Sequence, residues 1–298
     1  MGAMKIVISG GTGFIGEPLV RRLLSRGDDV AVLTRNPAKV RAGRPLAWEQ
    51  AGEAASADAV INLAGENVGG GRWTDARKKR IIESRVEATS ALVEAVNARP
   101  DDRRVFINAS AVGFYGLRGD EVLDETAPSG DGFLAEVVRR WEEIARRAEG
   151  AARLVILRFG VVLGPGGALG KMLLPFRLGA GGPIGSGKQW MSWVDREDVM
   201  RMILWAIDHP AVSGVYNVTA PNPVRNRDFA RSLGRALHRP AFMPVPAFAL
   251  RLAFGSEMAG EVLLGGQRVV PSRAAAEGFT FAYPDLDGAL RHAVSSAK

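Results

Sequence analysis

The stretch Lys5-Ile-Val-Ile-Ser-Gly-Gly-Thr-Gly-Phe-Ile-Gly16 decides the fold of this chain. Its apolar run, Ile6 to Ile8, has the character of a buried strand and leads into a turn dense in glycine. Beyond the turn, apolar residues recur at helical spacing until Gly27. The turn therefore connects a strand to a helix.

Three glycines of this turn, Gly10, Gly13 and Gly16, have the Gly-x-x-Gly-x-x-Gly spacing of a dinucleotide-binding loop. The strand must turn sharply, a pyrophosphate must approach the backbone, and the helix must pack close to the sheet. Each need is met by the absence of a Cβ. The amides and the positive dipole end of the new helix then face the phosphates. A tight turn between core elements can also be rich in glycine, but here the spacing and both flanking elements favour a dinucleotide.

The composition is that of a folded protein with a large core. The chain has 298 residues, 47% hydrophobic and 24% charged, which suits one large domain or a domain with a smaller lobe. It has no cysteine, which excludes disulfides and thiolate chemistry. Its three histidines, at positions 209, 238 and 292, are far apart, so we predict no metal site. No targeting pattern or membrane-length apolar run is present, and we expect a cytoplasmic protein that does not bind membranes.

The net charge of +7 raises the question of nucleic-acid binding. Basic residues alternate with acidic ones along the expected helices, as in residues 77–87 and 136–149, and no basic run is interleaved with aromatic residues. We therefore predict no nucleic-acid partner.

Strand-like and helix-like segments alternate along the chain. This alternation predicts an α/β fold, a doubly wound parallel sheet of the Rossmann type with a smaller carboxyl-terminal substrate lobe. Residues 4–165 are expected to form the nucleotide-binding domain, with its sheet completed by segments at about 186–220, and residues 166–298 mainly the lobe and tail. Strands are expected at 29–33, 45–48, 58–65, 104–109, 154–158 and 214–218, and helices at 74–97, 133–148 and 226–237.

The end of the second strand indicates which dinucleotide binds. An acidic residue there would hold the adenosine ribose 2′-hydroxyl, but this chain has Thr34 and Arg35. An arginine favours a 2′-phosphate, so the sequence predicts NADP(H) rather than NAD. The alternative is a solvated loop arginine. Leu63, Ala64 and Gly65 end the fourth strand and should pass beside the cofactor, because ligands bind at the carboxyl ends of such strands.

Four motifs make the chain similar to an extended short-chain dehydrogenase/reductase. They are Ser9 to Gly16, Asn62 to Gly65, Ser110-Ala-Val-Gly-Phe-Tyr-Gly116 and Leu157-Arg-Phe-Gly-Val-Val-Leu-Gly-Pro165. More narrowly, the chain resembles the atypical "epimerase family protein" branch, often labelled a sugar-nucleotide epimerase or a cell-division inhibitor. That branch is suggested by Gly65-Glu-Asn67, Phe133-Leu-Ala-Glu136, Gly185 to Trp193 and Gly265-Gly-Gln-Arg-Val-Val-Pro271.

The resemblance implies a cofactor site. The pyrophosphate would lie on Gly10, Thr12, Gly13, Phe14, Ile15 and Gly16. Thr34 and Arg35 would meet the 2′-phosphate, and Leu63, Ala64 and Gly65 the adenosine ribose and linker. The backbone from Gly160 to Val162 would contact the nicotinamide carboxamide.

Arg85 falls where extended members of the family often carry an asparagine on the long helix. Its side chain would reach either a phosphate or Glu66, which is itself a candidate polar group of the site. An exposed helix arginine is the equal alternative.

The chain departs from the family at the catalytic helix. Family members that do redox chemistry use Tyr-x-x-x-Lys, in which the tyrosine exchanges a proton with the substrate and the lysine lowers its pKa. Here the matching residues are Phe133 and Val137, which can do neither. Ser110 and Tyr115 are the remaining catalytic candidates. The alternative for Tyr115 is a loop tyrosine packed on the sheet edge.

Lys188, Gln189, Trp190 and Trp193, together with Phe133, are expected on the substrate side, where two indoles would supply apolar walls with one donor each. A packed connection between the lobes is the alternative. Asp195 and Asp198 are interpreted as helix-start acids.

Two functional hypotheses follow. In the first, the protein is an NADP-dependent oxidoreductase or epimerase acting on an unidentified small carbonyl or sugar-like substrate. In the second, it is a non-catalytic NADP(H)-sensing regulator that acts through a protein partner. Both a monomer and a homodimer remain open, because the helices that could pair are also needed by the sheet.

Overall fold

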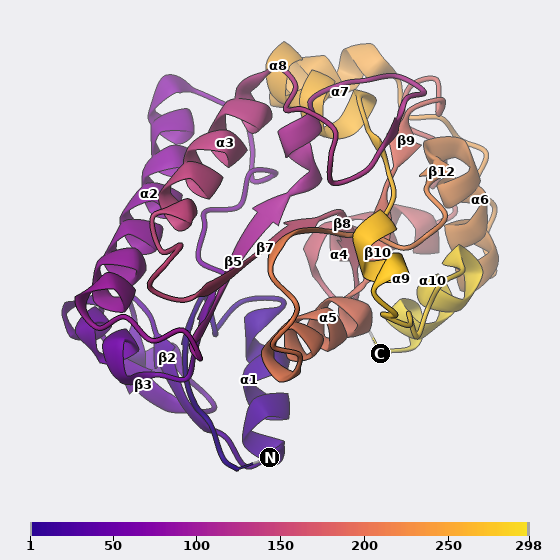
Figure 1. The fold of residues 1–298 in the computed structure, drawn as a ribbon. Coiled ribbons are helices and arrows are strands. Elements are labelled where there is room, and N and C mark those ends of the chain that lie inside the picture. The colour runs from indigo at the N-terminus through magenta and orange to yellow at the C-terminus, as the bar shows by residue number, and fades with distance from the viewer. Residues whose placement is uncertain (1, 297–298) are drawn as a thin grey trace.

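A parallel sheet of seven strands forms the centre of the computed structural model, which describes residues 2–296 (Figure 1). The strand order is β11-β7-β5-β4-β1-β2-β3, and it reverses between β1 and β4, where open α/β sheets bind their ligands. This confirms the predicted doubly wound Rossmann fold. The strands are β1 (Lys5–Ser9), β2 (Asp29–Leu33), β3 (Arg44–Leu46), β4 (Ala59–Asn62), β5 (Val105–Ala111), β7 (Arg153–Phe159) and β11 (Gly214–Val218).

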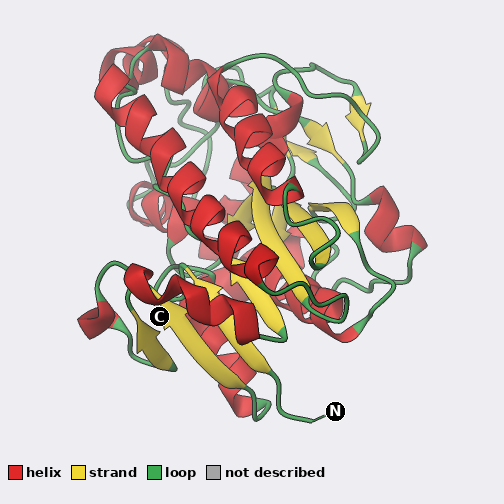
Figure 2. Ribbon diagram, turned by 60° about the vertical axis from the view of Figure 1, so that its left-hand side comes forward, coloured by secondary structure: helices red, strands yellow, loops and turns green. Residues whose placement is uncertain are grey.

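Helices cover both faces of the sheet (Figure 2). Side chains alternate along β1, so that Ile6 and Ile8 pack with α1 (Gly16–Ser25) and α5 (Arg196–Asp208). Val7 points the other way and belongs to the cluster that includes Leu92. That second face is covered by α2 (Asp75–Ala98), α3 (Phe133–Arg146) and the short helix η2 (Trp48–Ser56).

A smaller lobe lies beside the carboxyl ends of the strands. Its core holds Trp193 and side chains of α4 (Gly167–Arg177), α6 (Asn226–Leu237) and α10 (Leu286–Ser295). The tail segments α7 (Ala247–Phe254), α8 (Ser256–Met258) and η4 (Ala259–Leu264) lie at the top of Figure 1. Residues 297 and 298 of the predicted lobe lie outside the described residues. The remaining strands form two-stranded sheets outside the central sheet. They pair β8 (Val161–Leu163) with β10 (Trp193–Asp195), β9 (Trp190–Met191) with β12 (Val224–Arg225), and β6 (Val122–Leu123) with β13 (Arg268–Val269).

Two local predictions are corrected by the structure. The third strand ends at Leu46 rather than at Trp48, because Trp48 starts η2. The fourth strand ends at Asn62 rather than at Gly65, so Leu63, Ala64 and Gly65 lie in the loop that follows β4.

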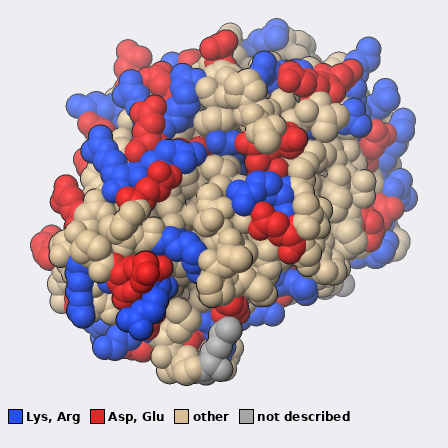
Figure 3. Space-filling view, viewed as in Figure 1, with Lys and Arg blue, Asp and Glu red and all other residues tan. Residues whose placement is uncertain are grey.

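Basic and acidic side chains are interspersed over the face shown in Figure 3. No helix within residues 2–296 combines the length and apolar character that crossing a membrane requires. The same residues hold no cluster of three or more His, Asp or Glu side chains suited to a metal ion.

Candidate active site

The glycine turn packs tightly against the end of β4. Gly10 has φ +72°, and a Cβ there would lie 2.7 Å from the carbonyl carbon and oxygen of Leu63. A Cβ on Gly16 would lie well under 3.0 Å from the carbonyl oxygen of Gly10, where no real Cβ sits. The missing side chains thus let α1 and the end of β4 meet at the turn.

The amino-terminal end of α1 has free hydrogen-bond donors. Ile15 precedes the helix and supplies no side-chain cap. Within residues 2–296, the amides of Phe14 and Ile15 make no hydrogen bond. Unpaired amides at a helix start bind anions, so the turn fits a pyrophosphate.

A cavity of about 410 Å³ lies next to the turn, and we call it the adenosine cavity. Arg35 borders it from the loop after β2, and Ala64 and Gly65 border it from the loop after β4. The sequence predicted these three residues together. The cavity is completed by residues that the sequence analysis did not single out, namely Trp48, Ser84, Glu87, Ala88 and Ala91.

The helical spacing of Ser84, Ala88 and Ala91, at i, i+4 and i+7, would have placed them on one face of α2. Nothing local identifies Trp48, which reaches the cavity from η2. The predicted partner Thr34 has its hydroxyl oxygen engaged by the amide of Asn36 at 3.2 Å.

Two further cations border the glycine turn. Lys39 and Arg41 line a narrow recess together with Gly11 and Thr12. Arg35 is exposed and takes part in none of the ion pairs found within residues 2–296. Arg35, Lys39 and Arg41 are therefore the cations available to a 2′-phosphate, while Glu17 lines the same recess and Glu87 the adenosine cavity.

The Arg85 side chain of α2 packs against the loop that follows β4. Its Nη1 donates to the carbonyl oxygens of Glu66 and Ile81 at 3.1 and 2.9 Å, and a Cβ on Gly65 would lie 3.0 Å from its Cζ. Burial lowers the pKa of Arg85 to about 10, which still leaves it charged at neutral pH. The structure thus places Arg85 under the loop, rather than on an exposed helix face, and pairs it with the Glu66 backbone.

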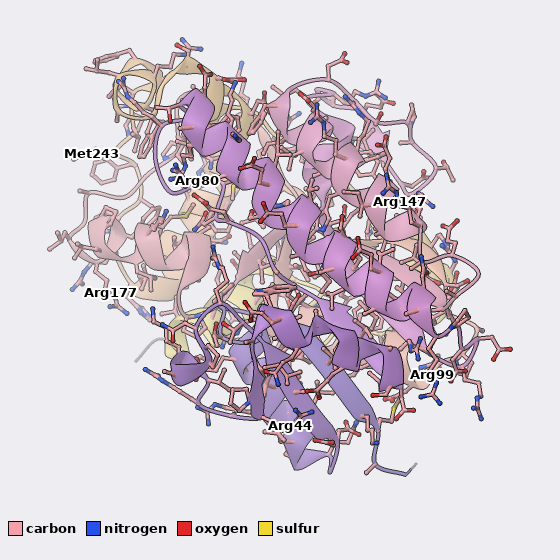
Figure 4. The ribbon with its side chains drawn as sticks, turned by 90° about the vertical axis from the view of Figure 1, so that its left-hand side faces the viewer. Arg44, Arg80, Arg99, Arg147, Arg177 and Met243 are labelled. Atoms are coloured by element: carbon pink, nitrogen blue, oxygen red, sulfur yellow. The ribbon has the colours of Figure 1, made fainter. Side chains whose placement is uncertain are left out.

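The Glu66 carboxylate faces α2 instead. Its oxygens lie 3.8 Å from Arg77 Nη1 and 3.6 Å from Arg80 Nε. Figure 4 shows Arg80 near the amino-terminal end of α2, on the side of the molecule that carries Arg177 and Met243.

A second cavity, of about 600 Å³, lies beyond the glycine turn, and we call it the large cavity. Phe14 of the turn lines it, as do Val161 and Val162 of the chain that follows β7. A Cβ on Gly160 would overlap the carbonyl oxygen of Ser192, and the Val161 amide donates to that oxygen at 2.8 Å. Close packing therefore fixes this end of the cavity. Its remaining walls come from α4, α6 and the tail.

Within residues 2–296, Lys171 is the only residue with a titratable side chain that lines the large cavity. Its Nζ donates to the carbonyl oxygen of Gly69 at 2.8 Å, so it links α4 to the loop after β4. The sequence analysis did not identify it.

Ser110 and Tyr115 belong to a buried polar network beneath the site. Ser110 Oγ donates to Glu142 at 2.6 Å, and Arg158 donates two hydrogen bonds of 2.8 Å to the same carboxylate. The Tyr115 hydroxyl donates to Asn217 at 2.7 Å and accepts from Arg158 at 3.0 Å.

Comparison with known proteins identifies the family. The NAD dependent epimerase/dehydratase family matches residues 6–219, and a domain of unknown function, DUF1731, matches residues 245–293. The chain belongs to the epimerase/dehydratase family. The predicted atypical extended short-chain dehydrogenase/reductase is thereby confirmed.

Relatives cover the chain almost completely. It is 42% identical to the chloroplastic SDR39U1 homolog of Arabidopsis thaliana over 97% of this chain and 86% of that protein. It is 38% identical to the epimerase family protein YfhF of Bacillus subtilis over 99% of both. A crystal structure of human SDR39U1 isoform 2 with NADPH has a TM-score of 0.91, with 38% identity over 98% of this chain and 99% of that one.

In this member of the epimerase family, the predicted catalytic residues are not open to a substrate. Tyr115 has 0% and Ser110 2% of its surface exposed. Burial raises the pKa of Tyr115 even though Arg158 opposes the shift, so the phenol stays protonated at neutral pH. The geometry corresponds to the alternative interpretation, a tyrosine packed under the loop.

None of the five residues expected on the substrate side lines the large cavity. Trp193 is fully buried and donates to the carbonyl oxygen of Asn222 at 3.1 Å, and Trp190 donates to Asp120 at 2.8 Å. Gln189 donates to two backbone carbonyls, and Lys188 is exposed. Gln189, Trp190 and Trp193 are thus held by contacts within the protein, as in the alternative of a packed connection, whereas Lys188 is not packed.

Phe133, the fifth, packs edge-to-face on Trp73 with ring centroids 4.8 Å apart. The two acids behave differently from each other. Asp195 caps α5 through the amide of Glu197 at 2.7 Å, whereas Asp198 accepts the tail amides of Ala282 and Tyr283 at 2.7 and 2.9 Å.

Proposed function

We propose that this protein is an NADP(H)-dependent oxidoreductase that reduces a small carbonyl compound bound in the large cavity. The observation that carries this proposal is the position of that cavity. Phe14 from the cofactor turn and Val161 and Val162 from the chain after β7 line the same space, so a substrate there would adjoin the nicotinamide end of the cofactor.

The cofactor is NADP(H). The human relative of known structure holds NADPH, and this chain has the donors and cations to bind it. The amides of Phe14 and Ile15 suit the pyrophosphate, and Arg35 with Lys39 and Arg41 suits the 2′-phosphate. When bound, the cofactor supplies the hydride.

Lys171 is the candidate proton donor. A carbonyl oxygen gains negative charge as its carbon is reduced, and an ammonium group at the cavity wall can stabilise that charge and transfer a proton to it. Lys171 is exposed, so water can restore its proton after the transfer.

Replacing Lys171 with methionine should lower kcat by about 10²- to 10⁴-fold, the usual contribution of a positioned general acid. The affinity for NADPH should not change. Steady-state turnover and calorimetry measure the two quantities. Lys171→Arg is the matched control, since it keeps the charge but cannot release a proton and should stay nearly as slow. Full turnover in Lys171→Met would show that Lys171 does not act as the proton donor.

Replacing Arg35 with aspartate should weaken NADPH binding on the order of 100-fold and leave NADH binding within a few fold, because only NADPH presents a phosphate to this side chain. Calorimetry with both cofactors measures the ratio. Arg147→Asp makes the same charge change at an exposed site outside the adenosine cavity and is the control. An unchanged NADPH-to-NADH preference in Arg35→Asp would contradict the role of Arg35.

Sugar epimerisation has less support than reduction. A sugar carries several hydroxyl groups that need polar partners, and neither a carboxylate nor a tyrosine lines the large cavity within the described residues. No observation favours the regulator hypothesis. A cytoplasmic location stays a prediction, and the Arabidopsis relative is named as chloroplastic.

A further inference from the structure

The large cavity is walled almost entirely by hydrocarbon and aromatic side chains. Helix α4 contributes Met172 and Phe176, α6 contributes Phe229, and the tail contributes Leu250 and Phe254. A nucleotide sugar carries a diphosphate and many hydroxyl groups, each of which needs a partner when it leaves water.

Few polar side chains line this space, and each makes a hydrogen bond within the protein. Among the described residues, Asn67 and Asn226 are the polar side chains that line it besides Lys171. Asn226 accepts from the amide of Ile184 at 2.7 Å, and Asn67 accepts from the amide of Gly69 at 2.8 Å. No arginine lines the cavity within residues 2–296. A diphosphate bound here would meet one lysine and would otherwise lie against apolar walls.

The walls are held apart by close packing behind them. A Cβ on Gly181 would overlap the ring of Phe176, and one on Gly182 would overlap the backbone of Met243. The glycine-rich segment 179–187 is thus wedged between α4 and the tail. These close contacts fix the position of the segment, so this part of the cavity wall is preformed.

Lys171 and the apolar side chains of the tail reach the cavity from different elements. Lys171 contacts the loop at Gly69, whereas Leu250 and Phe254 come from α7, one turn apart on the same helix face. Phe248 and Leu252 lie on the other face of α7 and are 72% and 73% exposed. Helix α7 therefore presents Leu250 and Phe254 to a ligand and leaves Leu252 outside.

We propose that the substrate is an aldehyde or ketone with an apolar aliphatic or aryl body, and not a nucleotide sugar. This rests on the proposed function. The carbonyl carbon accepts a hydride from NADPH, which becomes NADP⁺, and the carbonyl oxygen accepts the proton of Lys171, which water later replaces. The product is the alcohol, and the apolar body lies against α4, α6 and α7.

The test compares straight-chain aldehydes with a nucleotide sugar. With NADPH present, kcat/KM should rise about fourfold for each methylene from butanal to octanal, because each buried methylene adds a similar increment of binding. Leu250→Gln should flatten this dependence, because it places a polar amide in the wall against which the chain would lie. Leu252→Gln, on the exposed face of the same helix, should keep the full dependence. Equal kcat/KM for all chain lengths, or faster turnover of a UDP-keto-sugar, would overturn the proposal.

A binding experiment separates this proposal from the proposed function. A neutral fluorescent probe, N-phenyl-1-naphthylamine, should bind the holo-protein and be displaced by octanal but not by UDP-glucose. If octanal displaces the probe but is not reduced, the proposed reductase function is wrong and the proposed apolar ligand class still stands. Displacement by UDP-glucose, or no binding of the probe, would reject the ligand class.

Discussion

Replacing Glu142 with leucine should lower the free energy of unfolding by about 3–5 kcal/mol, the usual effect of removing one partner of a buried ion pair. The side chains of Arg158 and Glu142 are 3% and 4% exposed. Burial alone would lower the pKa of Arg158, but the hydrogen bonds and charge of Glu142 raise it overall. Without Glu142, a charged guanidinium would remain buried with no counter-ion.

Urea unfolding of the single variants Glu142→Leu and Arg158→Leu and of the double variant measures this effect. Each single variant should also melt on the order of 10 °C lower. The double variant should lose no more stability than either single one, because an apolar pair of similar volume is often neutral. Single-variant losses below about 1 kcal/mol would show that the network is not what holds α3 to β5 and β7.

Replacing Gly16 with alanine should weaken NADPH binding by about 100-fold or more, since a displacement of an ångström at a positioned group has effects of this size. The new Cβ would overlap the carbonyl oxygen of Gly10, which is backbone and cannot rotate away. Either α1 or the turn must shift, and both carry the amides that suit the pyrophosphate.

Calorimetric titration with NADPH measures the loss, and circular dichroism shows whether the variant is folded. Gly52→Ala is the matched control, because a Cβ at Gly52 meets no atom within 4 Å. It should bind NADPH like the parent protein. A folded Gly16→Ala variant with unchanged affinity would mean that the cofactor does not use this turn.

The cofactor half of the site was predictable because it depends on local signals and one topological rule. The glycine spacing marks the turn, and parallel strands place their carboxyl ends at one edge of the sheet. Gly10, Arg35 and Gly65 come from three different strand ends and meet there for that reason.

The substrate half was not predictable because long-range packing builds it. Trp193 was expected to line a substrate pocket, but it is buried in the hydrophobic core of the smaller lobe. Tyr115 was a catalytic candidate, yet Arg158 and Asn217 hold its hydroxyl under the loop. A single sequence does not distinguish an indole or phenol in a core from one in a pocket.

The cap of α3 also comes from a distant part of the chain and could not be predicted locally. Gly132 precedes this helix and has no side chain to cap it. Glu261 does so instead, accepting from the amides of Phe133 and Leu134 at 2.9 Å each. More than one hundred residues separate cap from helix, so no local pattern announces it. The same tail supplies the wall residues Leu250 and Phe254.

Transfer of deuterium from the cofactor shows whether the protein reduces a carbonyl compound. The protein is mixed with octanal and NADPH that carries deuterium on one face of nicotinamide C4, and the product is analysed by mass spectrometry. We expect octanol deuterated at carbon 1 from only one of the two C4 stereoisomers, and far more slowly in Lys171→Met. If NADPH binds by calorimetry and yet no carbonyl compound, apolar or sugar-like, gains deuterium, the protein is not a reductase.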